Sequence, residues 1–214
     1  MKSKRIKFKN KNIYQNLEEY IRKKSKTVIK DKEGHIDISQ VNFFKNLLKN
    51  NKWVKKIGET GFNLGHSSLS FLNNRKNTKV WSFDSNIHTY TKLGKKFIDK
   101  NFPKRHILIY GDSTKTLPQF KKKNKNFSFD LIFIDGGHSY KVCKEDIENM
   151  KELSNNKTIL VIDDIIPNRP WGRGPTKALE ELVEKGEIGN VKYFDNFEAL
   201  GKITRRWITA KYIF

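Results

Sequence analysis

The sequence predicts an α/β fold in which a seven-stranded, mostly parallel sheet carries helices on both faces. From Trp53 onward, apolar runs of four to six residues alternate with helical stretches of ten or more. Strands that alternate with helices in this way form a parallel sheet that is covered on both sides. The first five runs also end in or beside an acidic residue, at the sheet edge where such folds bind ligands. The expected fold is therefore doubly wound and Rossmann-like.

The apolar pattern places the elements of the main domain in order. Strands are expected at Val54–Ile57, Val80–Phe83, Ile107–Tyr110, Leu131–Ile134, Ile159–Ile162, Tyr193–Phe194 and Trp207–Phe214. Helices are expected through Leu69–Leu72 and over Thr91–Lys100, Lys115–Phe120, Lys141–Leu153 and Pro175–Lys185. The last of these begins at a proline, which favours the first turn of a helix.

Residues 1–52 come before the alternating pattern and are expected to form an N-terminal helical extension, followed by the main domain at 53–214. The segment Glu18–Lys24 indicates a short helix. Apolar residues recur at helical spacing from Ile38 to Leu48 and predict a second helix over Ser39–Asn50 that packs on the core.

Length and composition limit the class of protein. A chain of 214 residues is the size of one domain. Cys143 is the only cysteine, so no intramolecular disulfide can form and a reducing environment is expected. No run of 18 apolar residues occurs, and the basic N-terminus lacks the apolar stretch of a signal peptide. We therefore expect a soluble, cytoplasmic protein that does not enter the membrane; its oligomeric state is open, with a homodimer as one expectation.

The net charge is unusual and has two interpretations. The chain has 44 Lys and Arg against 23 Asp and Glu, which gives +21. Basic surfaces attract phosphates, so a nucleic acid is a possible partner. Alternatively, the charge reflects composition alone, because lysine and asparagine are abundant together and the positive charge is spread along the whole chain.

A glycine-rich loop follows the first expected strand, in the sequence Glu59-Thr-Gly-Phe-Asn-Leu-Gly-His-Ser67. Gly61 allows a tight turn, and Gly65 allows the backbone to approach a ligand closely. The pattern differs from the G-x-G-x-x-G of dinucleotide-binding loops, and no Gly-Lys-Ser/Thr of a phosphate-binding loop follows. A purely structural turn is the alternative interpretation.

Acidic residues at the next two strand ends extend this candidate site. Asp84 ends the second strand, where a carboxylate suits the two hydroxyls of a ribose. Asp112 and Ser113 follow the third strand, where they could hold an adenine amino group. Each is alternatively a helix N-cap, a role that Asp and Ser perform well. Taken together with the glycine loop, they fit an adenosine ligand.

Two further motifs, Phe129-Asp-Leu-Ile-Phe-Ile-Asp-Gly-Gly-His-Ser-Tyr140 and Ile162-Asp-Asp164, complete a resemblance that covers about residues 40–185. The chain resembles the class I S-adenosylmethionine (SAM) dependent methyltransferases. It is most similar to the macrocin-type and catechol-type metal-dependent O-methyltransferases, the group described as methyltransferase domain 24. The resemblance implies SAM as cofactor, with Glu59, Gly61 and Gly65 at its methionine end, Asp84 at the ribose, and Asp112 with Ser113 near adenine. Asn63, Ser67, Ser85 and Asp135 complete the cofactor-binding set.

Three carboxylates are expected to meet beside the methyl group. Asp135 follows the fourth strand, and Asp163 and Asp164 follow the fifth, its expected neighbour. Unpaired carboxylates in one cleft repel each other, and a divalent metal would relieve that repulsion. Oxygen ligands favour Mg²⁺, Ca²⁺ or Mn²⁺. The catechol-type enzymes have Asp-Asn where this chain has Asp163-Asp164, so one of the pair alternatively caps the next loop.

His138 is the expected general base. It lies three residues beyond Asp135, about where the catechol-type family has a lysine, and the ordinary pKa of histidine suits proton transfer near neutral pH. We expect the metal to acidify a substrate hydroxyl and His138 to take its proton, with Asp135 as the second catalytic residue. A structural turn histidine is the alternative. A nearby loop holds Arg169, Trp171 and Arg173, which suit an anionic or planar substrate or are simply solvated.

The sequence therefore favours metal-assisted O-methylation of a small-molecule or sugar hydroxyl. One alternative is an RNA or cap-type 2′-O-methyltransferase that uses Asp135 with surrounding basic and acidic residues, drawn from Lys45 or Lys49, Lys177 and Glu198. The adjacent Asp163 and Asp164 disfavour it, because they repel phosphate. Another alternative is a non-catalytic binding protein that keeps the fold.

Overall fold

The structure is a computed structural model that describes residues 12–25, 36–197 and 203–214. Its helices are α1 (Ile13–Lys24), α2 (Ile38–Asn50), α3 (His66–Asn74), α4 (Thr91–Asn101), α5 (Ser113–Lys123), α6 (Tyr140–Lys151) and α7 (Arg173–Glu184). Its strands are β1 (Lys56–Thr60), β2 (Lys79–Asp84), β3 (His106–Tyr110), β4 (Leu131–Ile134), β5 (Ile159–Ile162), β6 (Ile188–Phe197) and β7 (Ile203–Tyr212). None of the described helices has the length and apolar composition that a membrane span requires.

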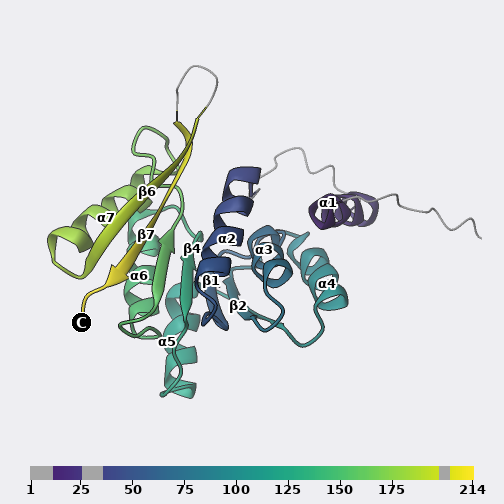
Figure 1. Ribbon diagram of the computed structural model, residues 1–214, viewed down its shortest axis with the longest axis horizontal. Coiled ribbons are helices and arrows are strands. Elements are labelled where there is room, and N and C mark those ends of the chain that lie inside the picture. The colour runs from purple at the N-terminus through teal and green to yellow at the C-terminus, as the bar shows by residue number, and fades with distance from the viewer. Residues whose placement is uncertain (1–11, 26–35, 198–202) are drawn as a thin grey trace, which may run out of the picture.

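The strands form one seven-stranded sheet in the order β3-β2-β1-β4-β5-β7-β6 (Figure 1). Strands β1 to β5 are parallel, whereas β7 runs antiparallel to both β5 and β6. The predicted doubly wound, mostly parallel fold is thus confirmed. The chain moves outward from β1 to β3 on one side and from β4 to β5 on the other. The carboxyl ends of β1 and β4 therefore flank the crevice where sheets of this kind bind ligands.

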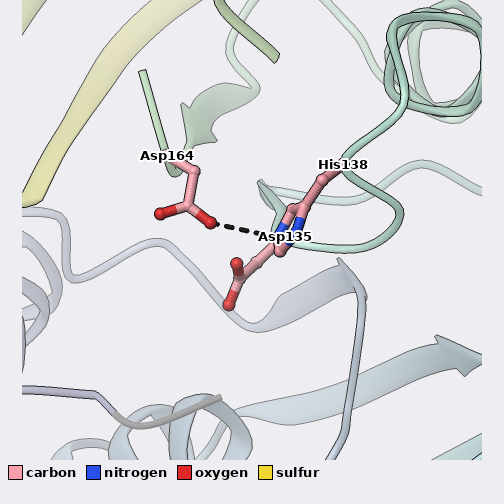
Figure 2. Close-up of side chains that lie close together, drawn as sticks. All are labelled: Asp135, His138 and Asp164. Atoms are coloured by element: carbon pink, nitrogen blue, oxygen red, sulfur yellow. Dashed lines mark ion pairs between the residues drawn. The ribbon is translucent and has the colours of Figure 1, made fainter. Parts of the chain in front are cut away.

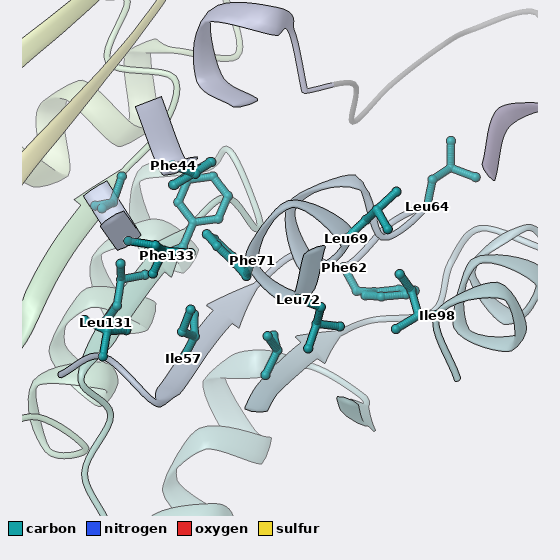
Figure 3. Close-up of a cluster of buried hydrophobic side chains, with 14 of the residues drawn as sticks. Phe44, Ile57, Phe62, Leu64, Leu69, Phe71, Leu72, Ile98, Leu131 and Phe133 are labelled. Carbon is teal, nitrogen blue, oxygen red and sulfur yellow. The ribbon is translucent and has the colours of Figure 1, made fainter. Parts of the chain in front are cut away.

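Alternating side chains of the strands supply two hydrophobic cores, one on each face of the sheet. Leu131 and Phe133 of β4 join the core beneath α1, α2, α3 and α4, whereas Ile132 and Ile134 join the core beneath α5, α6 and α7. Phe44 of α2 lies at the centre of the first core, with its ring centroid 5.1 Å from that of Phe133 (Figure 3). The described part of the N-terminal extension thus packs on the sheet's own core.

The apolar pattern misplaces the first strand. It predicts a strand at Val54–Ile57, but β1 runs over Lys56–Thr60. The last three residues of β1 are Gly58, Glu59 and Thr60, which are not hydrophobic and yet are buried. An apolar run cannot indicate a strand whose burial depends on polar partners from other elements.

Several other elements are longer than expected, among them one helix and the last hairpin. Helix α5 starts at Ser113, capped by Asp112, and continues past Pro118 to Lys123. Strands β6 and β7 form a hairpin of two ten-residue strands, whereas the apolar pattern predicts only Tyr193–Phe194 for the first and Trp207–Phe214 for the second. Polar and partly exposed residues fill much of this hairpin, so its apolar runs are short although its backbone pairing is long.

Candidate active site

The glycine-rich loop joins β1 to α3 and lies against the end of β4. Gly61 has a φ of 83°, and its N–H donates to the carbonyl of Phe83 at 2.9 Å. A Cβ on Gly61 would lie 1.9 Å from the carbonyl oxygen of Asp135, so this position requires glycine. Gly65 has a φ of 88° and is the N-cap of α3. Asn63 between them also has a positive φ, of 49°.

Asp84, at the end of β2, holds this loop in place. One carboxylate oxygen accepts hydrogen bonds from the backbone N–H groups of Phe62 at 2.9 Å and Asn63 at 2.8 Å. The other accepts from the N–H of Asn86 at 2.7 Å. The first oxygen already accepts two hydrogen bonds, whereas the second accepts one and keeps a lone-pair site that can accept from a ligand hydroxyl. Ser85, the next residue, is exposed beside it.

Glu59 is fully buried beneath the loop. Its carboxylate accepts hydrogen bonds from the hydroxyls of Ser67 at 2.7 Å, Ser82 at 2.5 Å, and Ser68. The Ser82 hydroxyl also lies 2.7 Å from Nε2 of His106. Burial raises the pKa of Glu59 to about 7, against the effect of the three hydroxyls. Glu59 and Ser67 thus hold β1, β2 and α3 together below the expected cofactor loop.

This buried carboxylate predicts a pH-dependent stability. The folded protein keeps the Glu59 proton up to pH about 7, whereas the unfolded chain releases it near its ordinary pKa of 4.5. Stability from this group is therefore lost as pH rises from 4.5 to 7. Glu59→Gln removes the loss, and we expect it to gain about 3 kcal/mol over the wild type between pH 4.5 and pH 8.

Urea unfolding of both proteins across this range measures the difference. The neighbouring His106 is kept in both, so its own titration cancels in the comparison. Parallel pH profiles for the two proteins would show that folding does not raise the pKa of Glu59.

At the end of β3, the structure gives Asp112 the role of a helix cap. Its carboxylate accepts hydrogen bonds from Thr114, at 3.0 Å from the backbone N–H and 2.8 Å from the hydroxyl. These bonds lower the pKa of Asp112. The side chain is half-exposed, so it remains open to a ligand. Ser113 follows it directly as the first residue of α5.

Asp135, His138 and Asp164 converge where β4 and β5 end. One donor atom from each residue lies within 4.8 Å of the others. Nε2 of His138 is 3.1 Å from a carboxylate oxygen of Asp164, and Figure 2 shows all three side chains directed toward one another. Burial and the repulsion from Asp163 and Asp164 raise the pKa of Asp135 well above its ordinary value.

Asp163, expected beside these residues, is held by other groups. One carboxylate oxygen accepts from Nε2 of Gln40 at 2.6 Å and the other from the backbone N–H of Asp164 at 2.9 Å. A guanidinium nitrogen of Arg205 lies 3.8 Å away and donates to Gln40 Oε1 at 2.5 Å. Burial raises the pKa of Asp163 and Arg205 opposes this shift. Asp163 thus differs from Asp135, His138 and Asp164, because its carboxylate contacts α2 through Gln40 and β7 through Arg205.

The comparison with known families decides the class. Residues 59–165, half of the chain, match the family described as methyltransferase domain. The chain belongs to this methyltransferase family. The matched residues run from Glu59 to just beyond Asp164, so they include both the glycine loop and the cluster of acids. The resemblance to SAM-dependent methyltransferases drawn from the sequence is thereby confirmed.

Solved structures share the whole fold at low sequence identity. The O-methyltransferase from Bacillus cereus in complex with SAH is 15% identical, with a TM-score of 0.75 over 96% of this chain and 93% of that one. TomG from Streptomyces achromogenes, an O-methyltransferase solved with SAM, is 13% identical with a TM-score of 0.74 over 96% and 92%. CalS11, a TDP-rhamnose 3′-O-methyltransferase, is 15% identical with a TM-score of 0.61 over 91% and 91%. No curated protein sequence matches the chain.

The loop of the methyltransferase that holds Arg169 and Trp171 lies against the turns that carry His138 and Asp164. The Arg169 guanidinium is 5.6 Å from the ring centroid of Trp171, which is partly exposed. A Cβ on Gly172 would lie 2.8 Å from the carbonyl oxygen of Asp164, and one on Gly174 would lie 2.2 Å from that of His138. The start of α7 therefore packs tightly on both turns that carry the candidate catalytic residues.

Sequence reasoning missed the buried polar residues that support the site. Gln40 and Arg205 lie far from Asp163 in the chain, so no local pattern connects them. Ser68 and Ser82 are uncharged, and only their place beside a buried glutamate makes them notable. Asp146 is not among the missed residues, because it is visible in the sequence as a charged residue that interrupts the apolar face of α6 a short way after His138. Glu198, named for the RNA alternative, and residues 1–11 of the basic N-terminus lie outside the described residues.

Proposed function

We propose that this methyltransferase transfers the methyl group of SAM to a hydroxyl of a small-molecule or sugar acceptor, with the assistance of a divalent metal. The observation that carries the proposal is the convergence of Asp135, His138 and Asp164 within 4.8 Å. The backbone of Asp135 lies against Gly61 of the glycine loop, and this contact supports a position for the cluster beside the expected methionine end of SAM.

SAM binding is supported by the arrangement of the three strand ends. Gly61 and Gly65 expose backbone along the methionine end, Asp84 is available to the ribose, and Asp112 with Ser113 to adenine. The sulfonium and ammonium groups of SAM are positively charged. The acids after β4 and β5 therefore attract this cofactor. The Bacillus cereus enzyme and TomG, which share this fold, were solved with SAH and SAM respectively.

A divalent ion fits the donor set. Asp135 and Asp164 offer carboxylate oxygens, which Mg²⁺ and Mn²⁺ prefer, and His138 offers a nitrogen within the same reach. The Arg205 guanidinium lowers the pKa of both Asp135 and Asp163. One guanidinium does not balance three neighbouring carboxylates, so negative charge remains in excess. A bound divalent ion supplies positive charge that lowers the pKa of a nearby hydroxyl. In this proposal Asp135 and Asp164 hold it.

His138 accepts the acceptor's proton. Its imidazole is half-exposed and is oriented by the 3.1 Å contact with Asp164. As the proton moves to the imidazole, the acceptor oxygen forms a bond to the methyl carbon. The bond from that carbon to sulfur breaks, and S-adenosylhomocysteine leaves. The chain's contribution is the alignment of the oxygen with the methyl group and the stabilisation of charge.

The acceptor is expected to carry an anionic or planar group. Arg169 and Trp171 lie in the loop beside His138 and Asp164, and Arg173 is the first residue of α7 after it. Arginine suits phosphate, carboxylate and aromatic faces. The net charge of +21 also attracts anions. Two proteins of the same fold are consistent with a small-molecule or sugar acceptor. TomG is involved in tomaymycin synthesis, and CalS11 is a TDP-rhamnose 3′-O-methyltransferase.

The test is a methyl-transfer assay with radiolabelled SAM against a panel of phenolic, sugar and nucleotide-sugar acceptors, with RNA as a separate arm. We expect transfer to a small hydroxyl compound, loss of that transfer in EDTA, and recovery with Mg²⁺ or Mn²⁺. Transfer to RNA that persists in EDTA would instead favour the 2′-O-methyltransferase alternative.

His138→Ala tests the base. We expect turnover to fall by about 10² to 10⁴-fold, because a positioned general base contributes about that much. Metal affinity should change little, since the carboxylates hold the ion in this proposal. Loss of metal binding in this variant would assign the imidazole to the ion instead.

A further inference from the structure

We propose that Asp146 is a positioning residue whose buried carboxylate accepts hydrogen bonds from the three turns that carry the SAM site when SAM is bound. The inference rests on the proposed function, because it concerns the affinity for SAM. It adds a residue that touches neither cofactor nor acceptor and acts through the turns above it.

Asp146 is a charged residue on an otherwise apolar helix face. It lies on α6 among Cys143, Ile147 and Met150, all buried, and its own exposed fraction is 0%. Neither carboxylate oxygen has a hydrogen-bond partner among the residues that the structure describes. A buried carboxylate without donors is costly, so a fold that keeps one requires an explanation.

The carboxylate faces three turns at once. A Cβ on Gly136, in the turn after β4, would lie 3.0 Å from Oδ2 of Asp146 and 3.0 Å from the hydroxyl oxygen of Thr60 at the end of β1. The Thr60 hydroxyl is also buried without a partner among the described residues. Burial raises the pKa of Asp146 to about 6, and the hydroxyls of Ser113 and Thr60 oppose this shift. Ser113 is the first residue of α5, so the start of this helix is the third turn beside the carboxylate.

These turns are the ones that hold the proposed SAM contacts. Thr60 precedes Gly61, Gly136 follows Asp135, and Ser113 itself is expected near adenine. A small inward movement of the two hydroxyls would complete their hydrogen bonds to Asp146. A ligand that spans all three turns favours that closed arrangement, so the energy of these bonds adds to SAM affinity. Gly136 is required there because a side chain would fill the space between carboxylate and hydroxyl.

The experiment compares SAM titrations and methyl-transfer kinetics for the wild type, Asp146→Ala, Asp146→Asn and Thr60→Val. We expect Asp146→Ala to raise the Kd and KM for SAM about 5 to 150-fold, the range for one to three kcal/mol of lost hydrogen bonding. At saturating SAM its kcat should stay within about threefold, and Asp146→Asn should recover most of the affinity because it keeps an acceptor. Thr60→Val removes one hydroxyl without loss of volume and should weaken SAM binding by about tenfold.

Met150→Ala is the matched control, since it lies on the same face of α6 and creates a cavity away from the turns. It should lose stability but keep SAM affinity. Unchanged SAM affinity in both Asp146→Ala and Thr60→Val, or a loss confined to kcat, would overturn the inference. If Asp146→Ala does not fold, Thr60→Val decides alone. Failure of the wild type to bind SAM would refute the proposed function itself and this inference with it.

Discussion

Replacing Gly61 with alanine is expected to abolish SAM binding and to lower the free energy of unfolding by about 3 kcal/mol or more. The added Cβ would meet the Asp135 carbonyl oxygen at 1.9 Å, and that oxygen belongs to backbone that cannot rotate away. The φ of 83° adds strain for any residue with a side chain. Either the glycine loop or the turn after β4 must therefore move.

Gly186→Ala is the control for backbone strain alone. Its φ is 70°, yet a Cβ there would have nothing within 4 Å. We expect it to cost about 1 kcal/mol and to leave SAM affinity unchanged. Urea unfolding and SAM titration of both variants make the measurement. Equal destabilisation by the two substitutions would show that the close approach of the glycine loop to Asp135 is not a feature of the folded protein.

Asp135→Asn is expected to reduce methyl transfer by about 10³-fold while the protein stays folded. The substitution removes one of the two carboxylates proposed to hold the ion, so the Mg²⁺ concentration needed for half-maximal activity should rise steeply as well. It also removes a buried charge that Asp163 and Asp164 repel. Without added metal, the variant should therefore be at least as stable as the wild type at pH 8, where that repulsion is greatest.

Assays at increasing Mg²⁺, together with thermal unfolding in EDTA, check both parts of this prediction. Asp99→Asn is a suitable comparison because Asp99 is exposed on α4 and pairs only with Lys95 among the described side chains. It should behave as the wild type does. An Asp135→Asn variant with full activity would remove Asp135 from the catalytic group.

The parallel sheet could be predicted from the sequence because its strands are short apolar runs, and their carboxyl ends share one edge by topology. The same topological rule predicts that Asp135 and Asp164 lie close together, as they do. It does not reveal that Asp163 is held by Gln40 and Arg205, because those contacts join residues more than 40 positions apart. Hydrogen bonds between distant elements leave no periodic pattern.

The bounds of β1 show a second limit. Its buried end holds Glu59, which a hydrophobic pattern excludes from a strand interior. Hydrogen bonds from three serine hydroxyls lower the cost of that burial, and the raised pKa keeps the carboxyl protonated up to about pH 7. The serines come from α3 and β2, so the sequence near Glu59 alone does not reveal these contacts. Asp112 illustrates the reverse case. The sequence left two roles open for Asp112, and the structure shows it as the N-cap of α5. Its contact with adenine stays a prediction.

The most direct test of the account is a calorimetric titration of SAM into the purified methyltransferase, with and without Mg²⁺, beside Asp84→Ala. We expect one SAM bound per chain. We also expect an affinity about 30 to 150-fold weaker in Asp84→Ala, because the carboxylate that orders the glycine loop is lost. No heat of binding and no thermal shift with the wild type would contradict the central claim that these strand ends form a SAM site.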